Sequence, residues 1–354
     1  MKKILALLLT LLLFAGLLTA CGTDSDAGEN TNTDTVSGVT STSGSDTDSE
    51  GTKNSASATD STSTKLEKGK YLVGLTDQTH RRLIVCDLAV ENWANDRAVV
   101  WQYKGVSAGG IKFRDNDYWG GKVVLWSGEE RAGIVSYATK KLLFSTKTVP
   151  ANPHSVELLP NGVFVVVGST GGAAYVYGAG KTEPSFTVSL PDGHGALWDP
   201  KYDVLWLEGG NLLQAYKVTG TAENPALEAV KGMTYHPNTS LHDMAPVYGN
   251  PDALLLTGAN GVVIFDKTTG RASHNYPAGG YLKTQTYVPG VGNYPDDKVY
   301  VFTTIRADNL TYKEWGTDRV EVFISFGNGR GKVVTRQAKG DAYYKARVWN
   351  PDYQ

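Results

Sequence analysis

Short alternating or continuously apolar segments, each ended by Gly, Asn or Asp, repeat along the chain from about residue 69. Six of these repeats read as a strand, a tight turn and a second strand: residues 71–87, 122–137, 163–178, 204–217, 253–267 and 298–326. Such runs, bounded by turn residues, are typical of β-hairpins. The same region shows no amphipathic helical pattern. The hydrophobic pattern therefore predicts an all-β domain.

The spacing of the hairpins predicts how the sheets are arranged. Successive hairpins begin about 40 to 60 residues apart, which leaves room for one flanking strand on each side. Six similar units of this size favour radial repetition over a β-sandwich. We expect a β-propeller of six four-stranded blades over residues 67–354.

Before most hairpins stands a segment that we expect to form the innermost strand of a blade. These segments are GGIKFRDN (109–116), HSVELLPNG (154–162), HGALWDPKYD (194–203), HDMAPVYGNPD (242–252) and KTQTYVPGVG (283–292). The final segment, KARVWNPDYQ (345–354), contains VWNP where 194–203 contains LWDP, and the first hairpin otherwise lacks an inner strand. We therefore expect the C-terminal strand to pair into the first blade and close the ring, which removes exposed sheet edges.

The first positions of these aligned segments should form a ring around the axis, because inner strands line the axis of a propeller. These positions are Gly109, His154, His194, His242, Lys283 and Lys345. Three imidazoles and two ammonium groups are thus predicted to face one channel, with a gap at the glycine. The turn between the second and third strand of each blade should surround the same mouth.

Such a ring allows several kinds of chemistry. Three neutral imidazoles, at His154, His194 and His242, can hold one divalent metal (Mn, Zn or Ca) with positions open for water or substrate. Lysines beside them would attract a carboxylate and stabilise an enolate-like intermediate, and a histidine or lysine could act as a general base. Without a metal, the ring would bind an anion. In a purely structural ring, each histidine would bond to backbone groups at the start of its strand.

The N-terminal region has a different composition. Two lysines precede an apolar run of roughly 15 residues that ends in Leu-Thr-Ala before Cys21, which predicts a lipoprotein signal peptide over 1–20 and lipidation, for example by palmitate, at Cys21. Residues 22–64 carry eight acids, one lysine and no aromatic side chain. We therefore expect 21–66 to be a disordered acidic tether that holds the domain at a membrane outside the cytoplasm.

Composition narrows the choice of partners. A net charge of −2 argues against a general nucleic-acid binder, and two cysteines cannot form a disulfide framework. The sequence contains no phosphate-binding loop, nucleophile elbow or paired-cysteine metal motif. Nothing in it requires an oligomer, and we expect a monomer.

Two resemblances add to this interpretation. The lipobox and acidic tether resemble surface lipoproteins of Gram-positive bacteria, while NPHSVELLPNG (152–162), GHGALWDPKYDVLWLEGG (193–210) and LHDMAPV (241–247) resemble a family of uncharacterised bacterial secreted propellers related to quinoprotein-like and repeat-type propellers. The second resemblance implies the fold and no activity. The three histidines are also similar to those of propeller lyases that act on uronic-acid oligosaccharides through a divalent metal. That pattern adds a glutamine ligand, for which Gln285 is the nearest candidate.

Three functions are compatible with these features. The leading prediction is a cell-surface propeller that binds an anionic small molecule or acidic sugar at the axial His/Lys ring. The first alternative is a metal-dependent polysaccharide lyase or hydrolase that uses the same three histidines. The second alternative is a protein-interaction scaffold whose ring is structural.

Overall fold

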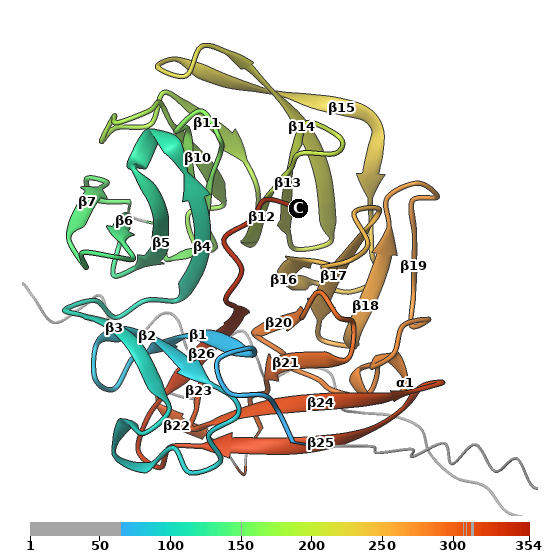
Figure 1. The fold of residues 1–354 in the computed structure, drawn as a ribbon. Coiled ribbons are helices and arrows are strands. Elements are labelled where there is room, and N and C mark those ends of the chain that lie inside the picture. Colours follow the sequence, from blue (N-terminus) through green and yellow to red (C-terminus); the bar gives the residue numbers. More distant parts are fainter. Residues whose placement is uncertain (1–64, 150, 307, 309, 313–314) are drawn as a thin grey trace, which may run out of the picture. The chain divides into compact units, whose positions relative to one another are not determined.

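A computed structural model describes residues 65–354 except 150, 307, 309 and 313–314. The predicted signal peptide, Cys21 and nearly all of the tether lie outside the described residues. Within the described part, six antiparallel sheets surround a central axis (Figure 1). The predicted all-β, six-bladed propeller is therefore confirmed.

Blades are numbered here in chain order, and their strands are given from the axis outward. Blade 1 consists of β26 (Tyr343–Val348), β1 (Leu72–Asp77), β2 (Arg82–Asp87) and β3 (Val99–Lys104). Blade 2 consists of β4 (Gly110–Asn116), β5 (Gly121–Gly128), β6 (Arg131–Ser136) and β7 (Leu142–Ser145). Blade 3 consists of β8 (Pro153–Leu158), β9 (Phe164–Gly168), β10 (Ala173–Tyr177) and β11 (Phe186–Ser189).

The second half of the domain repeats this order. Blade 4 consists of β12 (Gly193–Asp199), β13 (Val204–Gly209), β14 (Leu212–Gly220) and β15 (Pro225–Tyr235). Blade 5 consists of β16 (Leu241–Pro246), β17 (Ala253–Gly258), β18 (Gly261–Asp266) and β19 (Arg271–Ser273). Blade 6 consists of β20 (Gly290–Asn293), β21 (Val299–Thr303), β24 (Arg319–Gly327) and β25 (Arg330–Gln337).

A short insertion and little helix complete the described part. The strands β22 (Leu310–Tyr312) and β23 (Gly316–Thr317) lie between β21 and β24 in the chain and join the sheet of blade 1. Helical structure among the described residues is limited to η1 (Ala94–Asp96), η2 (Asp117–Trp119) and α1 (Gly279–Leu282). None of these helices is long and apolar enough to cross a membrane.

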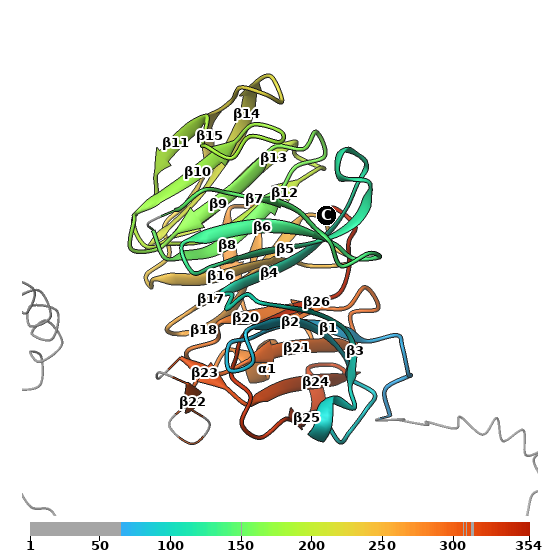
Figure 2. The same cartoon turned by 90° about the vertical axis from the view of Figure 1, so that its left-hand side faces the viewer.

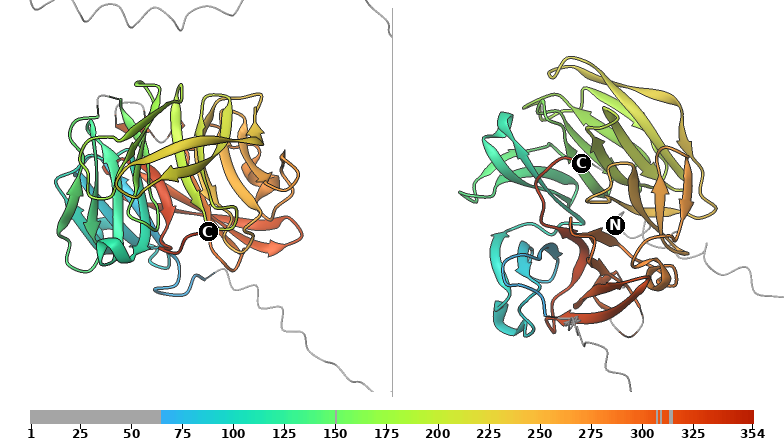
Figure 3. Two further views of the ribbon diagram at one scale, coloured as in Figure 1. Left: turned by 90° about the horizontal axis from the view of Figure 1, so that it is seen from above. Right: turned by 45° about the vertical axis from the view of Figure 1, so that its right-hand side comes forward.

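The last strand closes the ring as predicted. β26 pairs antiparallel with β1, so that Val348 lies opposite Val73 and Ala346 lies opposite Leu75. Blade 1 thus joins the beginning and the end of the described domain, and the innermost position of this blade is filled by the strand farthest away in the sequence. In the right-hand view of Figure 3, the dark red C-terminal segment lies in the middle of the ring.

The residues after β26 cover one end of the axis (Figure 1). The backbone N–H of Asp115 donates to the carbonyl of Pro351 at 2.9 Å, and the Asn116 amide donates to the Tyr353 hydroxyl at 2.9 Å. Gln354 reaches blade 5, where its amide donates to the carbonyl of Val247. These contacts lie where the inner strands end. The C-terminal segment thus lies at this end of the axis, and the inner strands begin at the opposite end.

Alternating residues of the strands hold neighbouring blades together, because successive side chains of a strand point to opposite faces of its sheet. In β9, Phe164 and Val166 pack against blade 2, whereas Val165 and Val167 pack against blade 4. Figure 2 views the ring from the side of blades 2 and 3, whose sheets lie face to face. The hydrophobic runs that read as buried strands in the sequence thus form cores between blades.

Candidate functional site

The three predicted histidines occupy equivalent positions in three successive blades. His154 lies near the start of β8, His194 near the start of β12 and His242 near the start of β16. At each of them the pairing with the second strand shifts by one residue, which is a β-bulge. A bulge leaves its extra residue out of the ladder and re-aims the side chain. The local backbone therefore explains why all three side chains meet at the axis.

The imidazoles form one cluster. The ring centroids of His154 and His194 are 4.7 Å apart, those of His194 and His242 are 4.4 Å apart, and those of His154 and His242 are 6.4 Å apart. The sequence alignment therefore identified these three neighbours correctly.

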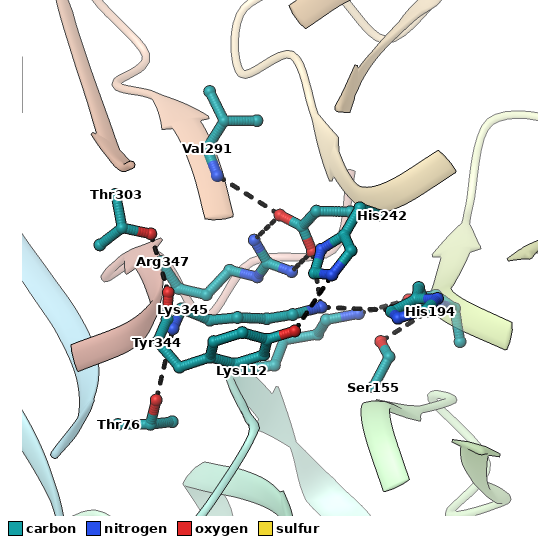
Figure 4. A network of polar contacts seen from close by, with 12 residues as sticks. Thr76, Lys112, Ser155, His194, His242, Val291, Thr303, Tyr344, Lys345 and Arg347 are labelled. Carbon is teal, nitrogen blue, oxygen red and sulfur yellow. Dashed lines mark hydrogen bonds and ion pairs between the residues drawn. The ribbon is translucent and has the colours of Figure 1, made fainter. Parts of the chain in front are cut away.

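Tyr344 is the fourth member of this ring. β26 carries a register shift of the same kind, and the Tyr344 ring lies 5.7 Å from that of His154 and 6.0 Å from that of His242. Its hydroxyl is hydrogen-bonded to His242 Nε2 at 3.1 Å (Figure 4). The alignment of VWNP with LWDP placed Lys345 in this row, which is wrong by one residue because the bulge shifts the start of the strand. We call His154, His194, His242 and Tyr344 the mouth ring.

The predicted place of Lys283 in the ring is also wrong. The inner strand of blade 6 begins only at Gly290, and Lys283 is an exposed residue at the C-terminal end of α1. Its backbone packs against the turn at Gly261, so it lies on the rim. Gln285, in the same segment, accepts a hydrogen bond from Arg306 at 3.2 Å instead of joining the histidines. A helical turn and a loop thus replace the strand that the sequence suggested.

The hydrogen bonds of the ring define its protonation. Nδ1 of His154 and of His194 each lies 2.8 Å from a backbone carbonyl, of Asn152 and Asp192 respectively, so Nδ1 carries the hydrogen and donates it. Burial, followed by the charge of Lys345, lowers the pKa of His194 to about 4. Burial and the neighbouring imidazole likewise lower the pKa of the half-buried His154.

His242 is the most deeply perturbed member of the ring. Burial, then His194 and Lys345, hold its pKa well below the ordinary value. The mouth ring is therefore neutral at pH 7, and any attraction for an anion must come from other groups.

A layer of buried ion pairs lies directly beneath the mouth ring (Figure 4). Lys345 Nζ lies 2.9 Å from Asp243 Oδ1 and donates to the carbonyl of His194 at 3.3 Å, while the Arg347 guanidinium binds both oxygens of Asp243. Lys345 is thus a neighbour of the ring, one residue below it. Asp243 is fully buried, which by itself would raise its pKa, but Arg347 and Lys345 outweigh this effect and lower the pKa to about 2.

Blades 2 and 3 contribute a second trio of the same kind. Lys112 Nζ lies 3.0 Å from Glu157 Oε2, and Arg114 donates to both oxygens of that carboxylate at 2.8 and 2.6 Å. Both inner strands, β4 and β26, therefore carry a Lys-x-Arg motif that faces one acid. In each trio a lysine and an arginine face one carboxylate, so one positive charge is left uncompensated.

Glu208 is the third acid beside the axis. It is fully buried, and neither of its carboxyl oxygens has a hydrogen-bond partner among the described residues. Burial raises its pKa to about 8, against the opposing influence of Lys345. Sequence analysis missed Glu208 because VLWLEGG looks like any strand that ends in a turn. We call the two trios together with Glu208 the ionic layer.

A cavity of about 550 Å³ opens beside the mouth ring on the side of the predicted gap at Gly109. Its lining comes from the turns of blades 1 and 2, the start of blade 3, the insertion of blade 6 and the ring itself: Gln78, Arg81, Ser107, Gly109, Gly128, Glu129, Asn152, Pro153, His154, Trp315 and Tyr344. The predicted convergence of hairpin turns at the mouth is thus seen for blades 1 and 2. We call this cavity the axial pocket.

A possible metal-binding group lies outside the mouth ring. Among the described residues, one set of three has ligand atoms that all lie within 4.8 Å of one another, namely Asp77, His80 and Asp341. However, Arg82 donates to Asp77 Oδ2 at 2.7 Å and lies 3.6 Å from Asp341 Oδ2. A cation would have to share these carboxylates with a guanidinium that already neutralises part of their charge.

Sequence comparison gives a family match over part of the chain. The profile of a family of unknown function (DUF6528) matches residues 119–279, from β5 to α1. No curated protein matches the chain.

Similar solved structures support the fold. A functionally unknown protein from Desulfotomaculum acetoxidans has 13% identity and a TM-score of 0.51, over 80% of this chain and 86% of that one. A chain of the nidogen/laminin complex has 13% identity and a TM-score of 0.53, over 79% and 99%. Dihydro-heme d1 dehydrogenase NirN in complex with DHE has 12% identity and a TM-score of 0.46, over 77% of this chain and 55% of that chain, about half of its length. At 13% identity, the likeness to the first two structures shows the fold alone.

Proposed function

We propose that this protein is a lipid-anchored, extracytoplasmic propeller that binds a small hydroxyl-rich acid, such as a uronic acid, in the axial pocket. The observation that carries the proposal is that the axial pocket opens beside a neutral aromatic ring and above a buried layer with an excess of positive charge. The predicted lipobox at Cys21 supports the location.

The ionic layer supports an acidic ligand. It contains four bases and three acids: Lys112, Arg114, Lys345, Arg347, Glu157, Asp243 and Glu208. Charges in a low-dielectric interior are weakly screened, and the field that they produce leaves the protein where it opens to solvent. An excess of positive charge on the axis therefore attracts anions to the pocket and repels cations. At the rim, Arg81 forms an ion pair with Glu129, and both residues line the pocket.

The pocket lining supports a sugar-like ligand. Trp315 is 46% exposed and donates to Gln78 Oε1 at 3.2 Å, so an indole and an amide lie side by side. Aromatic faces pack on the apolar side of a sugar ring, while amides and hydroxyls bond to its edge.

Calorimetric titration with D-galacturonate and with D-galactose tests this function, because the two sugars differ in the carboxylate. Galacturonate should bind more tightly, and the difference should shrink as salt is added, since charge attraction is screened. A His154→Ala variant should lose most of this binding. Equal affinity for both sugars would refute the acidic ligand, and absence of binding to either would favour the scaffold alternative.

Metal-dependent cleavage is the second candidate, favoured by one observation. Because His154 and His194 donate through Nδ1, their Nε2 lone pairs remain available, as in metal-bound histidines whose other nitrogen is held by a carbonyl. No choice of described ring nitrogens gathers all three histidines within 4.8 Å, so the side chains would have to turn on binding.

Metal analysis of the chelator-free protein beside a His154→Ala/His194→Ala/His242→Ala variant tests this candidate. Near-stoichiometric metal in the wild type alone would support it. Absence of metal from both proteins after addition of manganese, zinc or calcium would refute it, and metal in both would point to the group at His80.

A further inference from the structure

The carboxyl group of Glu208 lies on the axial side of blade 4. Glu208 on β13 pairs with Gly195 on β12, and a Cβ at position 195 would lie 2.5 Å from Glu208 Cγ and 2.6 Å from Oε1. The carboxyl group therefore fills the space that a side chain on the inner strand would take. A buried carboxylate without a hydrogen-bond partner is costly, and protonation relieves that cost.

Glu208 is connected to the mouth ring through blade 5. The Leu241 N–H donates to the Gly210 carbonyl at 2.6 Å, so the end of β13 meets the start of β16. Glu208 lies two residues before this contact and His242 one residue after it. His242 Nδ1 and Thr257 Oγ1 are also buried and have no partner among the described residues.

The other nitrogen of His242 leads to the axial pocket. His242 Nε2 is bonded to the hydroxyl of Tyr344, and Tyr344 lines the axial pocket. Buried polar atoms that gather without protein partners commonly share a water molecule. A water molecule between Glu208 and His242 Nδ1 would complete a path of proton donors and acceptors from the pocket to the buried acid.

We propose that, when Glu208 is ionised in the free protein, an anionic ligand enters the axial pocket together with one proton, that Glu208 holds this proton, and that His242 and Tyr344 connect Glu208 to the pocket. The inference rests on the proposed function and deepens it, because it makes the ligand class an acid taken up as a carboxylate plus a proton. No bond other than that of the proton forms or breaks: the proton comes from solvent and ends on a carboxyl oxygen.

The charges around Glu208 explain the coupling. Lys345 and Arg347 act on it from β26, Asp243 from β16, and Asp192 from the turn before β12. Above about pH 8, where Glu208 is ionised in the absence of a ligand, its charge balances the excess charge of Lys345 and Arg347 over Asp243. A ligand carboxylate in the pocket is attracted by the same positive charges, and it repels the negative charge of ionised Glu208. Ligand binding therefore favours the protonated form of Glu208. Lys345 itself already has Asp243 and the His194 carbonyl as acceptors.

The pKa of Glu208 determines how ligand affinity changes with pH. Since burial raises the pKa of Glu208 to about 8 in the free protein, ligand binding must raise it further. Affinity should therefore be constant below about pH 8 and should fall above it, by up to about tenfold per pH unit.

Titration of the full protein with D-galacturonate at about pH 9, in two buffers of different ionisation enthalpy, measures this proton directly. The wild type should take up a substantial fraction of a proton per ligand, and Glu208→Gln should bind galacturonate with none. Failure of galacturonate to bind would refute the proposed function and, with it, this inference. Binding without proton uptake, or equal uptake in Glu208→Gln, would overturn this inference alone.

A second measurement needs no ligand. A group whose pKa is raised in the folded state contributes stability at low pH that is lost as pH rises, here between about 4.5 and about 8. The free energy of unfolding of the wild type should therefore fall relative to that of Glu208→Gln across this range. Parallel curves for the two proteins would show that Glu208 holds no proton, and would overturn the inference even if the variant binds poorly.

Discussion

Two layers of polar side chains lie one residue apart along the inner strands, and they differ in charge. On β16, His242 belongs to the mouth ring and Asp243 to the ionic layer, and on β26 Tyr344 and Lys345 divide in the same way. The ring is neutral and reaches the axial pocket, whereas the two trios of the layer below are ionised and buried. The β-bulge turns one residue toward the ligand side and the next into the fold. Substitutions in the ionic layer should therefore act on stability, and substitutions in the ring on binding.

The largest effect should follow removal of a carboxylate from the ionic layer. Asp243→Ala leaves Lys345 and Arg347 buried without their acceptor, which should cost about 4 kcal/mol of unfolding free energy, because an unpaired buried charge is strongly unfavourable. Urea unfolding measures this cost. Asp243→Asn, which keeps the shape and removes the charge, is the matched control and should lose less. A loss below about 1 kcal/mol for Asp243→Ala would show that the layer is not structural.

The mouth ring and the ionic layer should also lose their contributions to the free energy of unfolding at different pH values. The pKa of His194 is about 4 in the folded protein and 6.5 ordinarily, so the unfolded chain takes up its proton first and stability is lost between about pH 6.5 and 4. The loss attributable to His194 is at most about 3 kcal/mol. The pKa of Asp243 is about 2, below its ordinary 3.8, so its contribution is lost only as pH falls further, through about 2.

Comparison of the wild type with His194→Leu tests the loss of stability that we attribute to His194, between about pH 6.5 and 4. The difference in unfolding free energy between wild type and variant should shrink as pH falls from about 6.5 to 4, while Glu208, whose pKa is raised, acts in the opposite direction in both proteins. A constant difference over this range would contradict a neutral ring.

The fold was predictable because it depends on short-range signals that repeat. Apolar runs, glycine turns and six similar spacings determine the strands, and VWNP near the C-terminus pointed to the strand that closes the ring. The three histidines were found because equivalent positions of repeated strands meet at the axis. The repeated strand pattern and the equivalent positions of the histidines can both be recognised even when the repeats are aligned with small errors.

The rest of the site depends on features that the pattern does not encode. A single bulge moved Tyr344 into the ring in place of Lys345, and a helical turn removed Lys283 from it. The ionic layer requires knowledge of which residues of different blades meet near the axis, for Lys112 on β4 and Glu157 on β8 lie 45 residues apart in the sequence. Glu208 is recognised only by its lack of a partner, which no sequence displays.

Within the mouth ring, His154 separates binding from stability. It is half-buried and lines the axial pocket, and among the described residues its side chain has a local hydrogen bond to the carbonyl of Asn152. His154→Ala should weaken galacturonate binding by about tenfold, equivalent to about 1.4 kcal/mol, and should change the unfolding free energy by less than about 1 kcal/mol. Titration and urea unfolding of the same sample compare the two effects. A larger loss of stability than of binding would place His154 with the ionic layer.

The smallest expected effect tests whether the ring and the ionic layer are independent. Tyr344→Phe keeps the aromatic contacts with His154 and removes the hydrogen bond to His242 Nε2, so it should cost about 1 kcal/mol of unfolding free energy. Because Lys345 and Asp243 keep their own bond, a double variant with Asp243→Asn should show nearly additive losses. Losses that differ from additivity by more than about 0.5 kcal/mol would show that the bulge couples the layers through the backbone between Tyr344 and Lys345. In that case a substitution in the mouth ring would also disturb the ion pairs beneath it. Effects on binding and on stability could then no longer be assigned to separate layers.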